Sequence, residues 1–154
     1  IALFVLGVIA GTLINASGSK AGSTRVLAAV TAALILASVL ASLGASAWAV
    51  PLLACAMGAM NAVFQRDGEV SIGLTYMTGT LVRAGQRIAV ALKGGARWDW
   101  APYLLLWAGL VLGAALGAFA YAQVGLAALW AIALLGVFLT MVFARLPDVG
   151  FSSR

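Results

Sequence analysis

The sequence predicts an all-α, polytopic bundle of transmembrane helices. Of its 154 residues, 64% are hydrophobic and only 8% are charged, and the mean hydropathy is +1.12. Soluble domains carry roughly 25% charged residues. So few charges cannot build a surface that faces water all round, so lipid must cover much of the outside. Apolar runs of helical length also follow one another along the chain, separated by short polar connections.

These apolar runs are expected to form the helices of the bundle. In order, they are Ile1–Ala16, Arg25–Leu43, Ala47–Phe64, Trp100–Ala122 and Leu126–Leu146. A membrane crossing needs about 20 residues, so the first run is a truncated span. It has no initiator methionine and no charged flank, and we therefore expect Ile1 to be an internal start with a segment upstream. Tyrosine and tryptophan at the ends of the fourth run indicate anchoring at the membrane interface.

The segment Ser71–Leu92 is long enough to span, but its composition is polar and the charges around it argue against a simple crossing. The charged connections lie around Lys20, at Gln65–Val70, at Lys93–Asp99 and in the C-terminal tail, whereas Gly44–Ser46 and Gln123–Gly125 carry no charge. If the segment re-enters, every basic connection falls on one side, which the positive-inside rule places in the cytoplasm together with the C-terminus. If it spans, this bias is lost. We favour a broken or re-entrant helix.

An internal repeat supports the same topology. Leu3, Gly7 and Gly11 have the spacing of Leu105, Gly109 and Gly113, and each copy is followed by a small-residue loop and another apolar run. We predict one membrane domain over residues 1–154, in which residues 1–46 end a first repeat and residues 47–154 form a second, inverted one. Inverted repeats with broken helices at a central site recur among secondary transporters.

The segment Thr75–Arg87 is the strongest candidate for a ligand site. A glycine between two threonines is expected to break the helix at Thr78–Gly79, leaving N–H groups that hydroxyls or a ligand satisfy. The positive end of the following helix favours an anion, and two arginines strengthen that field. The alternative is a kinked helix whose arginines reach the headgroups. Asn61 contacts the ligand or makes a helix–helix hydrogen bond. The predicted ligand-binding residues are Asn61, Thr75, Thr78, Gly79, Thr80, Arg83 and Arg87.

Glycines spaced four apart form two stripes with a predicted packing role. They are Gly7 and Gly11 in the first run, and Gly109, Gly113 and Gly117 in the fourth. Because glycine lets two helix backbones approach closely in lipid, we expect contacts within the chain or between subunits of a homo-oligomer.

Several function classes are excluded by what the sequence lacks. There is no histidine, Cys55 is the sole cysteine, and no pair of acids lies within an apolar run. We therefore predict no catalytic residues, no metal site and no cofactor, and do not expect an enzyme. The nine basic residues are scattered rather than gathered in a stripe. They indicate topology and contact with anionic headgroups of the bilayer, and not nucleic-acid binding.

The stretch Gly58–Leu92 resembles the YoaK-like family of bacterial integral membrane proteins, a domain of unknown function. The resemblance rests on Gly58, Met60, Asn61 and Ala62, followed by Thr75, Tyr76, Met77, Thr78, Gly79 and Thr80. Glutamine is common in the family where this chain has Met60. The resemblance implies a polytopic protein of which this chain is the C-terminal part, with a related T-G-N segment upstream.

Two functional hypotheses follow from these patterns. The first is a small permease or secondary transporter of a small solute or an ion in the bacterial inner (plasma) membrane. The alternative is a non-transporting scaffold or accessory subunit that acts through helix–helix contacts.

Overall fold

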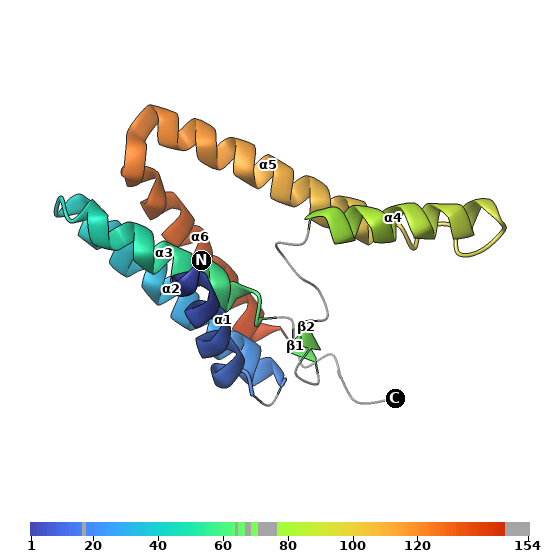
Figure 1. Cartoon of the computed structure of the whole chain (residues 1–154), viewed down its shortest axis with the longest axis horizontal. Helices are drawn as coiled ribbons and strands as arrows, with labels where there is room; N and C mark the ends of the chain where they lie inside the picture. Colours follow the sequence, from blue (N-terminus) through green and yellow to red (C-terminus); the bar gives the residue numbers. More distant parts are fainter. Residues whose placement is uncertain (17, 64, 67–68, 71–76, 147–154) are drawn as a thin grey trace. The chain divides into compact units, whose positions relative to one another are not determined.

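The computed structural model describes residues 1–16, 18–63, 65–66, 69–70 and 77–146 (Figure 1). The helices are α1 (Ala2–Ile14), α2 (Lys20–Ser42), α3 (Ser46–Met60), α4 (Met77–Leu92), α5 (Ala101–Val124), the 3₁₀ turn η1 (Gly125–Ala127) and α6 (Ala128–Arg145). Within these residues, strand structure is limited to a two-residue antiparallel pair, β1 (Gln65–Arg66) and β2 (Glu69–Val70). The predicted all-helical class is confirmed.

The chain divides into two compact units, and each is described by itself. The first comprises Ile1–Ile72 and Val124–Arg154, and the second comprises Gly73–Gln123. In the first unit, α3 contacts both α1 and α2, and α2 also contacts α6. Figure 1 shows α1, α2 and α3 lying side by side. The helices of this unit are therefore ordered α1, α3, α2, α6.

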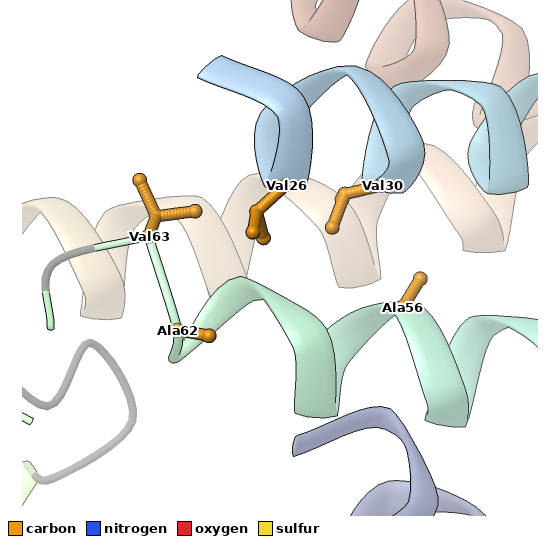
Figure 2. Packing of buried hydrophobic residues seen from close by; sticks show 5 residues of the cluster. All are labelled: Val26, Val30, Ala56, Ala62 and Val63. Atoms are coloured by element: carbon orange, nitrogen blue, oxygen red, sulfur yellow. The ribbon is translucent and has the colours of Figure 1, made fainter. Parts of the chain in front are cut away.

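The core of the first unit is built from small side chains. Figure 2 shows Val26 and Val30 of α2 facing Ala56 of α3 and the residues Ala62 and Val63 that follow it. A second cluster joins α2, α3 and α6 through Ala37, Ala49 and Leu129. Small residues at these contacts allow close approach of the backbones, which is how helices associate where lipid tails are as apolar as leucine.

Helix boundaries differ from the predicted ones where capping groups intervene. α2 begins at Lys20 rather than Arg25, because the Ser19 side chain accepts a hydrogen bond from the Gly22 N–H at 3.1 Å and caps the helix. α3 ends at Met60 rather than Phe64, a residue outside the described ranges. The N–H groups of Ala62 and Val63 bond three residues back, at 2.9 and 3.2 Å, which tightens the last turn.

The second unit consists of α4, a turn and α5. α4 ends in a Schellman motif: Gly94 has φ +89°, its N–H bonds the Ala91 carbonyl, and the Gly95 N–H bonds the Val90 carbonyl at 3.0 Å. The conformation of Gly94 requires a residue without a Cβ. α5 is apolar on all sides and none of its residues is buried, as expected of a helix that faces lipid.

Within the part of the chain that the structure describes, two helical stretches are long and apolar enough to cross a bilayer. They are Lys20–Ser42, with 23 residues, and the continuous stretch Ala101–Arg145, with 45. One crossing needs about 20 residues, so the second stretch has the length of two. α1 and α3 are apolar but shorter, at 13 and 15 residues.

The helix break expected at Thr78–Gly79 is absent. α4 runs without interruption from Met77 to Leu92, and Gly79 lies in its first turn. Glycine can adopt helical φ and ψ. The N–H groups of the first turn have no acceptor within the helix, so a glycine there breaks no hydrogen bond of the helix. The preceding part of the predicted re-entrant segment, Ser71–Tyr76, lies outside the described residues.

Candidate functional site

Two polar side chains, those of Asn15 and Ser23, meet where α1 ends and α2 begins, beside the chain that leaves α3. The Asn15 Nδ2 donates to the Ala62 carbonyl oxygen at 2.7 Å, and the Ser23 hydroxyl donates to the Val63 carbonyl oxygen at 2.7 Å. Asn15 Nδ2 also lies 3.5 Å from Ser23 Oγ. Asn61, the C-cap of α3, directly precedes these two carbonyl residues in the chain. We call Asn15, Ser23, Asn61 and the carbonyls of Ala62 and Val63 the polar junction.

The polar junction is buried in an otherwise apolar bundle. Asn15, Ser23 and Asn61 are 2%, 8% and 6% exposed. The carbonyls at a helix end have no donor within the helix. The side chains of Asn15 and Ser23 supply those donors to the chain leaving α3, and thereby hold it against α1 and α2.

One atom of the polar junction is left without a hydrogen bond. Asn15 Oδ1 is fully buried and has no donor among the described residues. It packs against Gly22, where a Cβ would overlap it. A buried acceptor without a donor costs about 1–3 kcal/mol, and such a group in a folded protein calls for an explanation such as a bound ion or water. Since the atom accepts and does not donate, it suits a cation or a ligand with a hydrogen-bond donor.

Asn61 was predicted from the sequence, whereas Asn15 and Ser23 were not. The Asn61 Nδ2 donates to the Met57 carbonyl at 3.1 Å within its own helix. Asn15 ends an apolar run and Ser23 follows a capping serine, so both look like ordinary helix-end residues in the sequence. Their position beside Ala62 and Val63 depends on contacts 40 and 47 residues apart, which no local pattern records.

The other predicted ligand residues lie in the second unit or outside the described ranges. Thr80, Arg83 and Arg87 follow one another at intervals of three and four in α4, so they share one helix face. Arg87 Nη1 lies 3.4 Å from Asp99 Oδ2, with both side chains about half exposed. Thr78 lies off this face, and Thr75 is outside the described residues. Asn61 belongs to the first unit, so a site shared by all of these residues stays a prediction.

The two glycine stripes have different surroundings. In the first unit, a Cβ added to Gly7 would overlap the Cys55 carbonyl oxygen. A Cβ added to Gly11 would lie 2.8 Å from the Ala59 carbonyl oxygen. Gly58 of α3 meets the Phe4 carbonyl in the same way. In α5, no described heavy atom lies within 4 Å of a Cβ built at each of the three glycines Gly109, Gly113 and Gly117.

The described residues offer no site of the kind that holds a transition metal. No three His, Cys, Asp or Glu side chains gather within them. The polar junction consists of neutral oxygen and amide groups, which are ligands for hard monovalent cations or polar solutes.

The two apolar helical stretches of spanning length, in a chain with so few charged residues, define a helical membrane protein. Residues 1–142 match the family described as "Protein of unknown function (DUF1275)". The chain belongs to this family.

A curated relative is consistent with the membrane class. The chain is 34% identical over 95 residues to the UPF0700 transmembrane protein RA0705 of Rhizobium meliloti (strain 1021). The match covers 62% of this chain and 42% of the relative. The chain therefore spans about two fifths of the length of that protein. No solved structure matches the chain.

Proposed function

We propose that the protein is a small permease or secondary transporter of a small solute or an ion in the bacterial inner membrane. The observation that carries this proposal is the buried Asn15 Oδ1 within the polar junction, which has no donor among the described residues. Polar side chains inside a membrane bundle are costly, and they typically mark ligand pathways. Transporters also place ligand sites where helix ends expose backbone carbonyls.

The chemistry of the polar junction favours one class of ligand. Its groups are amides, a hydroxyl and two backbone carbonyls, all neutral. Neutral oxygen atoms bind monovalent cations or solutes with hydrogen-bond donors, and divalent cations usually need carboxylates as well. We therefore propose an alkali cation, ammonium or a small polar solute as the ligand. The arginine face of α4 would favour an anion instead, and that site stays a prediction.

The remaining expectations complete the proposal. They are a YoaK-like protein with inverted repeats, re-entry of the segment Ser71–Leu92, and a C-terminus in the cytoplasm. The proposed protein performs no catalysis, takes no cofactor and binds no nucleic acid. The repeat boundary after Ser46 also stays a prediction.

A ligand screen with two matched serine variants tests the function. The full chain, purified in detergent, is screened by thermal shift against alkali cations, ammonium and small polar solutes, and hits are then assayed for uptake into proteoliposomes. Ser23→Ala should weaken ligand binding about tenfold, the equivalent of one lost hydrogen bond to a buried group. Ser38→Ala is the control, because Ser38 is also buried in α2 but donates to the Leu34 carbonyl of its own helix at 2.8 Å. Equal effects of the two variants would count against the polar junction as the site.

The residues predicted in α4 need a separate test. Thr78→Val and Gly79→Leu should abolish ligand binding while insertion into the membrane is unchanged, if the first turn of α4 contacts the ligand. Normal binding by both variants would leave the polar junction as the sole candidate site.

A second function, that of a scaffold or accessory subunit, is favoured by the exposed glycines of α5. The stripe of α1 is already occupied by α3, whereas no described atom covers the stripe of α5. In this alternative, Gly113→Ile should dissociate a complex detected by cross-linking, and the variants in α4 should matter little. An intact complex in Gly113→Ile would remove the observation that favours the scaffold.

A further inference from the structure

α4 has one apolar and one polar face, whereas the following helix, α5, is apolar on all sides. Leu81, Ile88 and Leu92 recur at helical spacing on one face, and they are 40%, 37% and 83% exposed. The opposite face carries Arg83 and Gln86. Among the described side chains of α4, Ala84 alone is buried. α4 is therefore amphipathic, and the described residues leave most of both faces uncovered.

α5 provides the internal reference for a helix in lipid. Its side chains Leu105, Leu112 and Leu116 are 73%, 61% and 68% exposed, and the apolar surface continues around the whole helix. α4 does not reach the length and hydropathy of a candidate span. A helix with one apolar and one basic face, of moderate overall hydrophobicity, is suited to the plane between headgroups and acyl chains.

The second unit also carries a surplus of positive charge. Arg83, Arg87, Lys93 and Arg97 are all exposed, and Asp99 is the one acidic residue between positions 77 and 123. Asp99 pairs with Arg87 at 3.4 Å. The other three cations therefore have no carboxylate to match them within this range, and their charge complements an anionic surface.

Aromatic side chains lie in the turn between the two helices. The rings of Trp98 and Trp100 lie with their centroids 5.6 Å apart, and Trp100 Nε1 donates to the Arg97 carbonyl at 2.9 Å. Trp98 is 67% exposed. Tryptophan concentrates at the headgroup level, where one part of the ring is apolar and the N–H finds a polar partner.

From these observations we propose that α4 and the turn 93–100 form a surface that lies along the membrane interface and binds anionic phospholipid headgroups. Arg83, Lys93 and Arg97 contact the phosphates, and the face of Leu81, Ile88 and Leu92 enters the upper acyl region. This inference does not depend on transport and holds equally for a scaffold.

The depth of α4 in the bilayer tests the first part of the proposal. In a Cys55→Ser background, single cysteines replace Leu81, Ile88, Leu92 or, as the control in α5, Leu112, and each carries an environment-sensitive fluorophore. The full chain is reconstituted in vesicles whose lipids carry bromines at shallow or deep acyl positions.

The probes at the three positions of α4 should be quenched equally by the shallow bromines, and the probe at position 112 should be quenched by the deep bromines. A graded depth from Leu81 to Leu92 would show that α4 spans, and absence of quenching would show that protein covers it. Either result overturns the proposal.

The charge of the lipid tests the second part. The probe at position 88 should be quenched more by brominated phosphatidylglycerol than by brominated phosphatidylcholine at equal mole fraction. Arg83→Gln combined with Arg97→Gln should lower this preference about fivefold for each charge removed. Arg145→Gln at the end of α6 is the control and should leave the preference unchanged. An unchanged preference in the double variant, or none in the parent protein, overturns the assignment of the anionic lipid.

Discussion

The glycines of α1 and those of α5 follow the same spacing but have different surroundings. Gly7 and Gly11 lie against the backbone of α3, so close that a Cβ would overlap or crowd a carbonyl oxygen. A Cβ added to any of the three glycines of α5 would meet no described heavy atom within 4 Å beyond its own stretch of helix. Close backbone approach allows dense van der Waals packing, which is a main source of helix association in lipid, and adds weak Cα–H···O contacts.

This difference shows that a small-residue stripe does not by itself determine which helix packs against it. The spacing creates a groove on a helix, but the identity of the helix that fills it depends on a reciprocal small residue. α3 supplies Gly58 opposite Phe4 of α1, so the two helices pack on each other's backbones.

Gly7→Ala is expected to cause the largest loss of stability. The added Cβ would overlap the Cys55 carbonyl oxygen, and a backbone atom cannot move aside as a flexible side chain can. Overpacking of this kind typically costs about 1–3 kcal/mol, and we expect a value at the upper end. The unfolding free energy, measured by SDS titration in mixed micelles, provides the test. A loss below about 0.5 kcal/mol would contradict the close contact of α1 with α3.

Ser23→Ala is expected to lower the unfolding free energy by about 1–2 kcal/mol, because the buried Val63 carbonyl loses its donor. Ser38→Ala should cost less, since the Leu34 carbonyl that it bonds belongs to the same helix. The same SDS titration compares the two variants. Equal losses would mean that the polar junction contributes no more than an ordinary serine in a helix.

The contact of α2 with α6 should show a smaller coupling. The hydroxyls of Thr31 and Thr140 lie 3.0 Å apart, and Thr140 also donates to the Gly136 carbonyl at 2.7 Å. Hydrogen bonds between membrane helices contribute about 0.6 kcal/mol on average. A double-mutant cycle with Thr31→Val and Thr140→Val should return a coupling of this size. A coupling of zero would show that this pair does not hold α6 against α2.

Gly113→Ala should have the smallest effect and completes the comparison with Gly7→Ala. Nothing described lies near the added Cβ, so the unfolding free energy should change by less than about 0.5 kcal/mol. The two variants introduce the same methyl group into two apolar helices, so their difference isolates the contact. A loss as large as that of Gly7→Ala would show that another helix covers the stripe of α5 in the assembled protein.

Local sequence patterns predicted much of the secondary structure. The apolar runs gave the helices α1, α2, α3, α5 and α6 to within a few residues, because hydropathy and helix ends are local properties. The errors fall at helix boundaries and at the expected break. Ser19 extended α2, and Gly79 was accommodated in the first turn of α4 without interrupting it.

The low charge content predicted the membrane class and the apolar runs predicted the helical content, since so few charged residues leave no alternative to a lipid-facing surface. Which groups meet became known only from the packing of the helices. That packing brings Asn15 and Ser23 to the carbonyls that follow α3, leaves Asn15 Oδ1 without a donor among the described residues, and places α3 on one glycine stripe. Hydropathy depends on each segment alone, whereas these contacts depend on the packing of helices that are distant in the chain.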